Sequence, residues 1–254
     1  MSKTTSLKEI DTTAPKSLNK KETKKENIKL AEKIGKLQYQ MAAQGKYSML
    51  VILQGMDASG KDGATRHVFS MCNPSGCEVE SFKVPTSEEL SHDFLWRVHK
   101  YAPAKGMIQV FNRSHYEDII IPVLNKTISK KTLKRRYDHV NDFEELLADN
   151  DTTVIKIYLH VSPEQQRERL QERMTNPEKH WKHNPDDWNK ADRYDDMVDI
   201  YDDIFDQCDT VPWNIIPADN NWYKVNQISK IVLKALEDMK LDWPKLEEGR
   251  VNVL

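Results

Sequence analysis

Long apolar runs are missing from this chain, and cysteine is scarce. Charged residues interrupt every apolar stretch, so none approaches the roughly 20 residues that a membrane helix needs. The first residues also lack the apolar core of a signal peptide. We therefore expect a cytoplasmic protein that binds no membrane. Cys72, Cys77 and Cys208 have no metal-ligand spacing, so we expect reduced cysteines without a chemical role.

A large excess of one charge is also missing. The formal net charge is −2 at pH 7, which excludes the broad basic surface of a general nucleic-acid binder but not a local basic channel. We therefore expect no nucleic-acid partner. The length of 254 residues, 38% of them hydrophobic, is sufficient for one sizeable core.

Polar and apolar residues are distributed unevenly along the chain. Residues 1–27 are polar and Lys-rich with almost no apolar periodicity, so we expect a mobile tail there. Residues 28–254 are expected to form a single domain. Its first helix can end at Gly45 in a left-handed cap. The apolar residues that indicate this helix are Leu30, Ile34, Leu37 and Met41.

Five apolar, β-branched runs alternate with amphipathic segments of helical length. The runs are Met49 to Leu53, Val79 to Val84, Met107 to Phe111, Val154 to Val161 and Trp213 to Ile216. Ser162 before Pro163, with Gln165 three residues after the serine, predicts a helix start with a capping box. This alternation predicts an α/β fold with a mostly parallel five-stranded sheet, helices on both faces and ligands at the carboxyl ends of the strands.

Glycine is scarce, with 8 in the chain, so the spacing within Gly55 to Lys61 carries information. This stretch fits G-x-x-x-x-G-K between an apolar strand and a helix, which is the context of a phosphate-binding loop. Backbone N–H groups and the positive end of the helix would hold an anion, and Lys61 would neutralise phosphate oxygens. The alternative is a glycine-rich turn with a solvated lysine, which the flanking elements make the weaker interpretation.

Two aspartates lie beside this lysine, and Asp62 stands where such loops normally carry Ser or Thr. Asp57 could bond its own turn, and Asp62 could simply stabilise the first turn of a helix. With phosphates and magnesium present, the two carboxylates instead become metal ligands or orient the attacking phosphate. That arrangement suits phosphoryl transfer to another phosphate.

A second polar cluster follows the apolar run that ends at Phe111. Arg113 offers a fork of donors to phosphate, and Glu117 and Asp118 lie on the next predicted helix, where they could contact a nucleotide or its metal. A structural salt bridge is the alternative for Arg113. Because this cluster follows a strand of the same parallel sheet, we expect it at the same sheet end as the loop.

A closing segment is predicted near residues 173–190, where Pro177 and Pro185 break a helical pattern. Closure would bring cations towards the loop and exclude water from the charged reactants. The alternative is that neighbouring glutamates, Glu164, Glu168 and Glu172, pair with the arginines along the helix. The cations are Arg167, Arg169, Arg173, Lys179 and Lys182, with Arg173 and Lys179 the preferred candidates.

Six short blocks carry a family resemblance. They are GMDASGKDG at 55–63, SFKVP at 81–85, LSHDFLWR at 90–97, FNRSHYED at 111–118, PEKHWK at 177–182 and VPWNIIPAD at 211–219. In this order they resemble the polyphosphate kinases of family 2, which transfer phosphate between inorganic polyphosphate and nucleotides. The resemblance covers about Leu30 to Lys240. It implies a P-loop kinase-like three-layer α/β/α fold with a helical lid, and a homo-oligomer, with a tetramer favoured.

The resemblance also implies roles for individual residues. Asp57 and Asp62 would place Mg²⁺, or Mn²⁺, and the reacting phosphates. Lys61 and Arg113 match the phosphate-contacting lysine and arginine of the family. Asn112 stands where many members have an aspartate, which argues against a metal-ligand role for it. Glu117, after R-S-x-Y, resembles the branch that also accepts nucleoside monophosphates.

We therefore predict a Mg²⁺-dependent enzyme that reversibly transfers the terminal phosphate of inorganic polyphosphate to nucleoside diphosphates and monophosphates (ADP, GDP, AMP, GMP), so that triphosphates also bind. The predicted catalytic residues are Asp57, Lys61, Asp62, Arg113 and Glu117. The predicted phosphate-binding residues are Gly55, Gly60, Lys61, Gly63, Arg66, Lys83, Arg113, Arg173, Lys179 and Lys182. The predicted nucleotide contacts are Asn112, Glu117 and Asp118.

Two other functions are considered. A nucleoside monophosphate kinase that uses ATP as donor would share the fold and the lid, but Asp62 in place of Ser or Thr argues against it. A non-catalytic polyanion-binding protein would need the basic residues but not the two loop aspartates.

Overall fold

The computed structural model describes residues 6–246, in which five strands form one sheet in the order β2-β3-β1-β4-β5. Every pair of neighbouring strands is parallel. The predicted mostly parallel sheet of five strands is therefore confirmed. The strands are β1 (Ser48–Gln54), β2 (Cys77–Ser81), β3 (Ile108–Asn112), β4 (Thr152–His160) and β5 (Trp213–Pro217).

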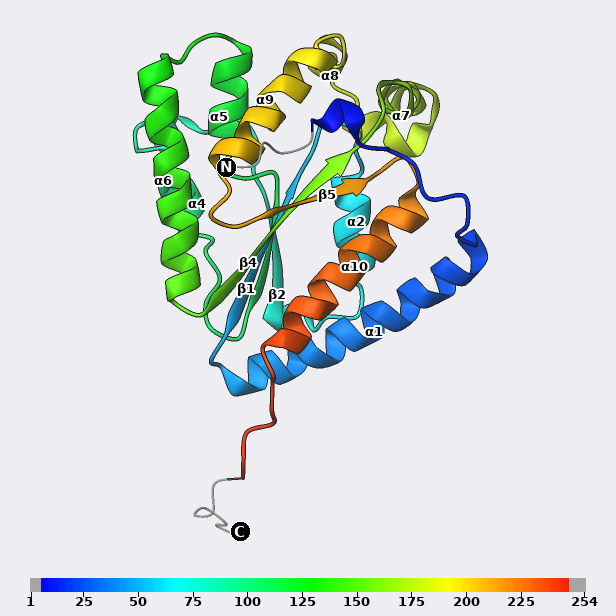
Figure 1. Ribbon diagram of the computed structural model, residues 1–254, viewed down its shortest axis with the longest axis vertical. Coiled ribbons are helices and arrows are strands. Elements are labelled where there is room, and N and C mark those ends of the chain that lie inside the picture. The colour runs from blue at the N-terminus through cyan, green and yellow to red at the C-terminus, as the bar shows by residue number, and fades with distance from the viewer. Residues whose placement is uncertain (1–5, 247–254) are drawn as a thin grey trace.

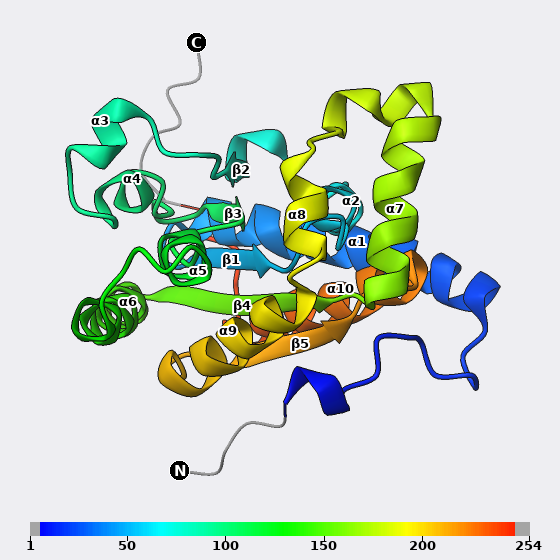
Figure 2. The ribbon, with the colours of Figure 1, turned by 90° about the horizontal axis from the view of Figure 1, so that it is seen from above.

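Helices cover both faces of this sheet, which confirms the three-layer α/β/α prediction (Figures 1 and 2). On one face lie α1 (Lys20–Gln44), α2 (Lys61–Val68) and α10 (Asn221–Asp238). On the other face lie α5 (Glu117–Leu124), α6 (Lys130–Asp149) and α9 (Tyr194–Gln207). Shorter helices are α3 (Ser87–Leu90), α4 (Trp96–His99) and α8 (Asp186–Ala191), and α7 (Pro163–Thr175) follows β4. Within residues 6–246, no helix combines the length and apolarity that a membrane crossing requires.

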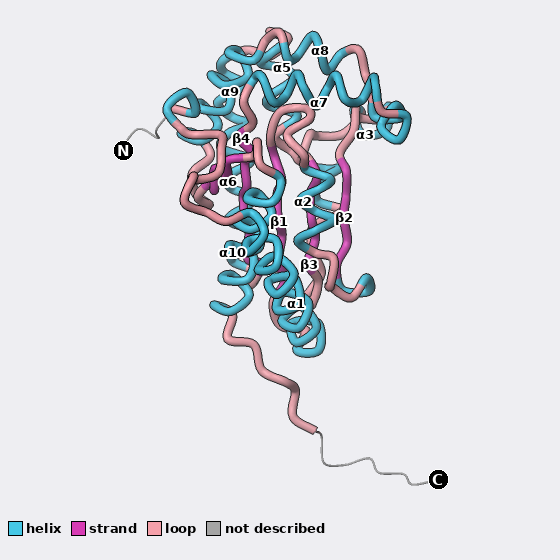
Figure 3. Tube along the Cα trace, turned by 90° about the vertical axis from the view of Figure 1, so that its right-hand side faces the viewer, coloured by secondary structure: helices cyan, strands magenta, loops and turns pink. Residues whose placement is uncertain are grey.

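The central strand β1 fixes where the functional loops gather. All seven of its residues are buried, because the strand pairs with β3 on one side and β4 on the other. In a parallel sheet the carboxyl ends of the strands share one edge, and the connections that follow the strands meet there. Figure 3 shows α7 and α8 beyond this edge, above the ends of the strands.

The edge strand β2 differs most from its predicted bounds. We expected it at Val79 to Val84, and it runs from Cys77 to Ser81. Val84 is 89% exposed, so the apolar run at its end is surface loop and not strand. An edge strand is paired on one side only, and its apolar pattern therefore marks its ends poorly.

The start of α7 confirms the predicted cap but not the capping box. The Ser162 hydroxyl accepts a hydrogen bond from the Gln165 backbone N–H at 3.2 Å. The Gln165 amide donates to Glu168 instead of turning back to the serine. The Ser162 N–H donates to the Asp219 carboxylate at 2.9 Å, so a residue from the β5–α10 connection completes this helix start.

The boundary expected at residue 27 is wrong for the described part of the N-terminal region. α1 begins at Lys20, and a short 3₁₀ turn, η1 (Leu7–Glu9), lies against α9. Leu7 is fully buried, and its N–H donates to Asp202 at 3.0 Å. One apolar side chain and a few hydrogen bonds dock this stretch, so apolar periodicity could not reveal it. Residues 1–5 lie outside the described residues.

Gly35 allows α1 to approach the end of α2, and we predict that Gly35→Ala destabilises the fold. A Cβ at this position would lie 2.2 Å from the Met71 carbonyl oxygen, so the variant should lose about 1–3 kcal/mol of unfolding free energy. Urea unfolding measures this loss. Gly63→Ala is the matched control, because a Cβ there has open space and should be neutral or stabilising by up to about 1 kcal/mol. Equal effects of the two substitutions would contradict the close approach of α1.

Candidate functional site

The glycine-rich segment after β1 forms a strand–loop–helix connection, as a phosphate-binding loop requires. α2 begins at Lys61, directly after Gly60, which has φ 92°. Ala58 also has a positive φ, of 61°. The positive φ favours glycine at position 60, and a Cβ there would also lie 2.1 Å from Lys224 Nζ and displace that side chain.

Lys61 lies inside this loop. Its side chain is buried, and Nζ donates to the carbonyl oxygens of Gly55 at 2.6 Å and Met56 at 3.1 Å. Burial, with the charge of Arg113 as a smaller cause, lowers the pKa of Lys61 to about 8. The alternative of a solvated lysine is therefore wrong.

Asp57 makes its contacts outside its own turn. Its carboxylate pairs with Arg113, which follows β3, and lies 3.4 Å from Lys190 Nζ on α8. Burial favours a higher pKa for Asp57, but the charges of Arg113, Lys61 and Lys190 outweigh burial and hold the pKa below its usual value. Asp57 is therefore an anion that joins the loop to two other elements.

Asp62 lies in the first turn of α2 and joins the same end of the sheet to the lid. Its carboxylate accepts hydrogen bonds from Lys182 Nζ at 2.6 Å and from the Asn112 amide at 2.7 Å. Burial favours a higher pKa for Asp62, but these two hydrogen bonds outweigh it and lower the pKa. Asn112 thus orients a loop carboxylate, which an aspartate at that position could not do by donating.

Arg113 has a backbone conformation that is rare for a residue with a side chain. Its φ is 64°, and strained conformations of this kind gather at functional sites. Glu117 follows in the first turn of α5. Burial raises the pKa of Glu117, although Arg113 and Lys61 oppose the shift. The sequence places these residues correctly at the same sheet end as the loop.

A cavity of about 580 Å³, here called the α5-side cavity, lies beside Arg113 and Glu117. Lys83 and Asp118 also line it. Asp118 lies 3.7 Å from the buried Arg97, measured from carboxylate Oδ2 to guanidinium Nε. Asp118 therefore has a protein partner at the wall of the cavity.

A second hollow of about 230 Å³, here called the loop-side pocket, is lined by Ala58 and Gly60 of the loop. Six predicted phosphate-binding residues line it: Gly60, Gly63, Arg66, Arg173, Lys179 and Lys182. Lys83 and Arg113 line the α5-side cavity instead. Eight of the ten predicted phosphate-binding residues are thus divided between two hollows, and Gly55 and Lys61 line neither of them.

The predicted lid cations bind acids and carbonyl groups of the protein. Arg173 pairs with Asp187 at 2.5 Å, from α7 to α8. Lys179 pairs with Glu172 at 2.5 Å. The alternative, in which glutamates of α7 pair with its arginines, is wrong for Arg173, because α8 folds back and supplies its acid partner.

Arg169 is a structural anchor of the loop. Its guanidinium donates to the carbonyl oxygens of Ala58 and Ser59 in the loop and of Ala218 and Asp219 after β5, at 2.7–3.2 Å. These contacts fix the loop to the β5–α10 connection. The sequence suggested that Arg169 is a mobile cation of the lid, and this prediction is wrong.

Lys224 of α10 is a site residue that sequence analysis missed. It is buried in the wall of the loop-side pocket and donates to Ser59 O and Asn221 Oδ1, both at 2.9 Å. Burial, followed by the charges of Arg169 and Lys61, lowers the pKa of Lys224 to about 7. Its spacing with the buried Ile228 and Val232 is the signal that could have placed it on the inner face of the helix.

We predict that polyphosphate affinity falls as the pH rises through about 7 and then about 8, where Lys224 and Lys61 lose their protons in the free protein. A bound phosphate favours the charged lysines, so binding takes up protons, and affinity falls by up to about tenfold per pH unit for each lysine. Calorimetry in buffers of different ionisation enthalpy measures this uptake. Lys224→Met, checked for folding, should lose the lower step. The same pH profile in the parent and the variant would contradict this role.

Comparison with known proteins agrees with this geometry. Residues 17–244 match the family described as polyphosphate kinase 2 (PPK2). The chain is 43% identical over 227 residues to the AMP/ADP-polyphosphate phosphotransferase of Meiothermus ruber, covering 89% of this chain and 85% of that relative. It is 35% identical to the ADP-polyphosphate phosphotransferase of Rhodopseudomonas palustris, covering 86% and 81%. The solved structure of polyphosphate kinase 2 from Arthrobacter aurescens TC1 matches with a TM-score of 0.94 and 35% identity, covering 98% of this chain and 91% of that one. The chain belongs to the polyphosphate kinase 2 family.

Proposed function

We propose that this protein transfers the terminal phosphate of inorganic polyphosphate to nucleoside diphosphates and monophosphates, and that the reaction is reversible. The observation that carries this proposal is a pair of hollows near one phosphate-binding loop: the loop itself lines the first, and the second is lined by Arg113 and Lys190, the two ion-pair partners of the loop residue Asp57. The loop-side pocket would hold the polyphosphate donor, and the α5-side cavity would hold the acceptor nucleotide. The names of the two relatives, which mention AMP, ADP and polyphosphate, support the choice of substrates.

The chain's own residues position and neutralise the reactants. Lys61 and Arg113 would offset negative charge on the transferred phosphoryl group, which a kinase must do while it holds attacking and leaving oxygens in line. The lid cations Lys179 and Lys182 would turn from their carboxylate partners to the donor phosphates. Closure of the lid would exclude water and so strengthen these contacts.

Asp57 and Asp62 would hold Mg²⁺, or Mn²⁺. Within residues 6–246, no group of three His, Cys, Asp or Glu side chains forms a metal site by itself. Mg²⁺ in phosphotransferases usually binds one or two carboxylates together with substrate phosphates, so two ionised loop aspartates fit it. When bound, the metal supplies positive charge to the phosphate oxygens of the reactants.

The cellular setting and the assembly stay predictions. The homo-oligomer, with a tetramer favoured, rests on the family resemblance. The cytoplasmic location and the single domain that extends to residue 254 rest on the composition and pattern of the sequence.

Purified protein mixed with polyphosphate, Mg²⁺ and one acceptor at a time tests the proposal. ADP should yield ATP only when a divalent metal is present, and GDP, AMP and GMP show the acceptor range. Asp62→Asn keeps the size of the side chain and removes its charge, and it should lower turnover by at least about tenfold. Near-normal turnover of this folded variant would show that Asp62 only stabilises the first turn of α2. Absence of product from the parent with every chain length and metal would refute the proposal.

Acceptor range should depend on Glu117, which lines the α5-side cavity beside Arg113. Its carboxylate could hold a metal or a bound water where a monophosphate lacks its second phosphate. We predict that Glu117→Asn lowers kcat/KM for AMP by about tenfold or more and leaves kcat/KM for ADP within about threefold. Glu117→Gln keeps the length of the side chain and separates charge from size. Equal losses with AMP and ADP would show that Glu117 only stabilises the first turn of α5.

A further inference from the structure

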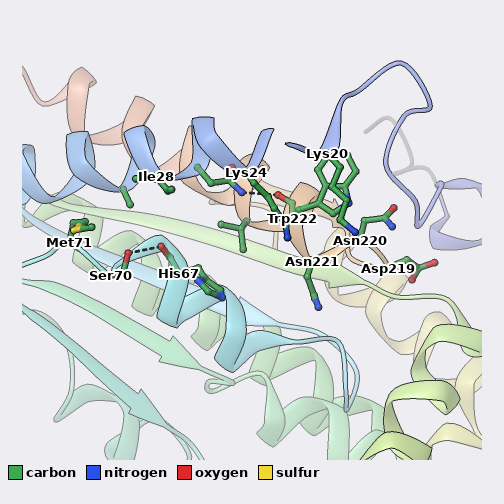
Figure 4. A pocket seen from close by; sticks show the side chains of 13 residues that line it. Lys20, Lys24, Ile28, His67, Ser70, Met71, Asp219, Asn220, Asn221 and Trp222 are labelled. Atoms are coloured by element: carbon green, nitrogen blue, oxygen red, sulfur yellow. Dashed lines mark hydrogen bonds between the residues drawn. The ribbon is translucent and has the colours of Figure 1, made fainter. Parts of the chain in front are cut away.

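A groove of about 670 Å³ continues from the loop-side pocket between α1, α2 and α10. Figure 4 shows Lys20, Lys24 and Ile28 of α1 on one wall and His67 of α2 on the other. His67 lines both hollows, as do two residues of α10. An elongated ligand could therefore pass from the loop-side pocket into this groove, here called the α1 groove.

The charged residues that line the α1 groove are Lys20, Lys24 and Asp219, so the two lysines outnumber the single carboxylate. Within residues 6–246, no ion pair forms at Lys20 or Lys24, or at Arg66 of the adjoining loop-side pocket, whereas Lys179 and Lys182 of the lid both have acid partners. The remaining charged group of the groove, Asp219, accepts hydrogen bonds from the Ser162 N–H at 2.9 Å and the Thr12 hydroxyl at 2.7 Å.

Apolar side chains also line the α1 groove. Ile28, Met71 and Val225 line the groove beside its two lysines. A cleft with an excess of one charge and apolar side chains in its walls raises the local concentration of counter-ions.

The length of α2 restricts which anion can reach the groove from the loop. His67 lies seven residues after Gly60, which corresponds to about 10 Å along the helix axis. An anion whose end lies at the loop must extend beyond this distance to contact Lys20 and Lys24. A long polyphosphate chain meets this requirement and offers a charge at every unit.

We propose that the α1 groove binds the trailing part of a long polyphosphate chain whose reacting end lies in the loop-side pocket. Lys20 and Lys24 supply the contacts from α1, and His67 lies where the chain would pass from the loop-side pocket, which Arg66 lines, into the groove. This inference rests on the proposed function, because it assigns a further subsite to the same donor.

Donor-length kinetics of Lys20→Ala/Lys24→Ala test the proposal. KM is measured for a long-chain polyphosphate and for the shortest polyphosphate that the parent enzyme uses. The ratio of the long-donor KM to the short-donor KM should rise about fivefold, because two exposed charge contacts are lost. The slope of log KM against log salt concentration for the long donor should become flatter by roughly one. Lys25→Ala/Lys29→Ala is the matched control, since it removes equal charge from α1 at residues outside the groove, and it should keep the parental ratio.

An unchanged ratio in Lys20→Ala/Lys24→Ala, or an equal rise in the control variant, overturns the proposal. A rise of KM for ADP or ATP instead would place a nucleotide in the groove. A changed oligomeric state of Lys20→Glu/Lys24→Glu, without the change in ratio, would make the groove an interface between copies. If the parent enzyme makes ATP from polyphosphate, the proposed function holds whichever of these results is found. The experiment can therefore contradict the polyphosphate site in the α1 groove without contradicting the proposed function.

Discussion

Ion pairs between the two loop aspartates and cations from distant segments hold the candidate site together. Asp57 pairs with Arg113 after β3 and with Lys190 on α8, and Asp62 pairs with Lys182 in the lid. A hydroxyl in place of Asp62 could not hold a lid lysine by charge. In the free protein the two carboxylates therefore hold cations of distant segments beside the loop.

The fold supports this arrangement at a cost in stability. Lys61 and Lys224 are buried beside the loop, and burial lowers the pKa of each. Burial destabilises the charged form of each lysine, which lowers its pKa. A bound phosphate would stabilise that charged form again. Arg169 compensates in part, since it fixes the loop through four carbonyl oxygens. A bound polyanion would therefore gain binding free energy by stabilising the charged forms of these two lysines.

Sequence analysis predicted the features that depend on neighbouring residues. The buried strand β1, the phosphate-binding loop and the sheet end of Arg113 and Glu117 all follow from local pattern and from the parallel topology. Features that depend on distant contacts were missed. Lys224 lies 163 positions from Lys61 along the chain, and the Arg173–Asp187 pair forms because α8 folds back on α7. The docked turn at Leu7 was not predicted because a single leucine gives no apolar periodicity in the sequence.

We propose that Asp57 and Asp62 exchange their protein cations for a metal when substrates bind. A crystal structure with polyphosphate, Mg²⁺ and a non-hydrolysable ADP analogue tests this proposal most directly. We expect Lys182 and Lys190 to contact phosphate oxygens and to have left Asp62 and Asp57, whose carboxylates contact the metal directly or through its water. The polyphosphate should lie in the loop-side pocket and the nucleotide in the α5-side cavity. Bound substrates with both carboxylates still paired to these lysines, and no metal beside them, would contradict the proposal that the loop aspartates exchange protein cations for metal during phosphoryl transfer.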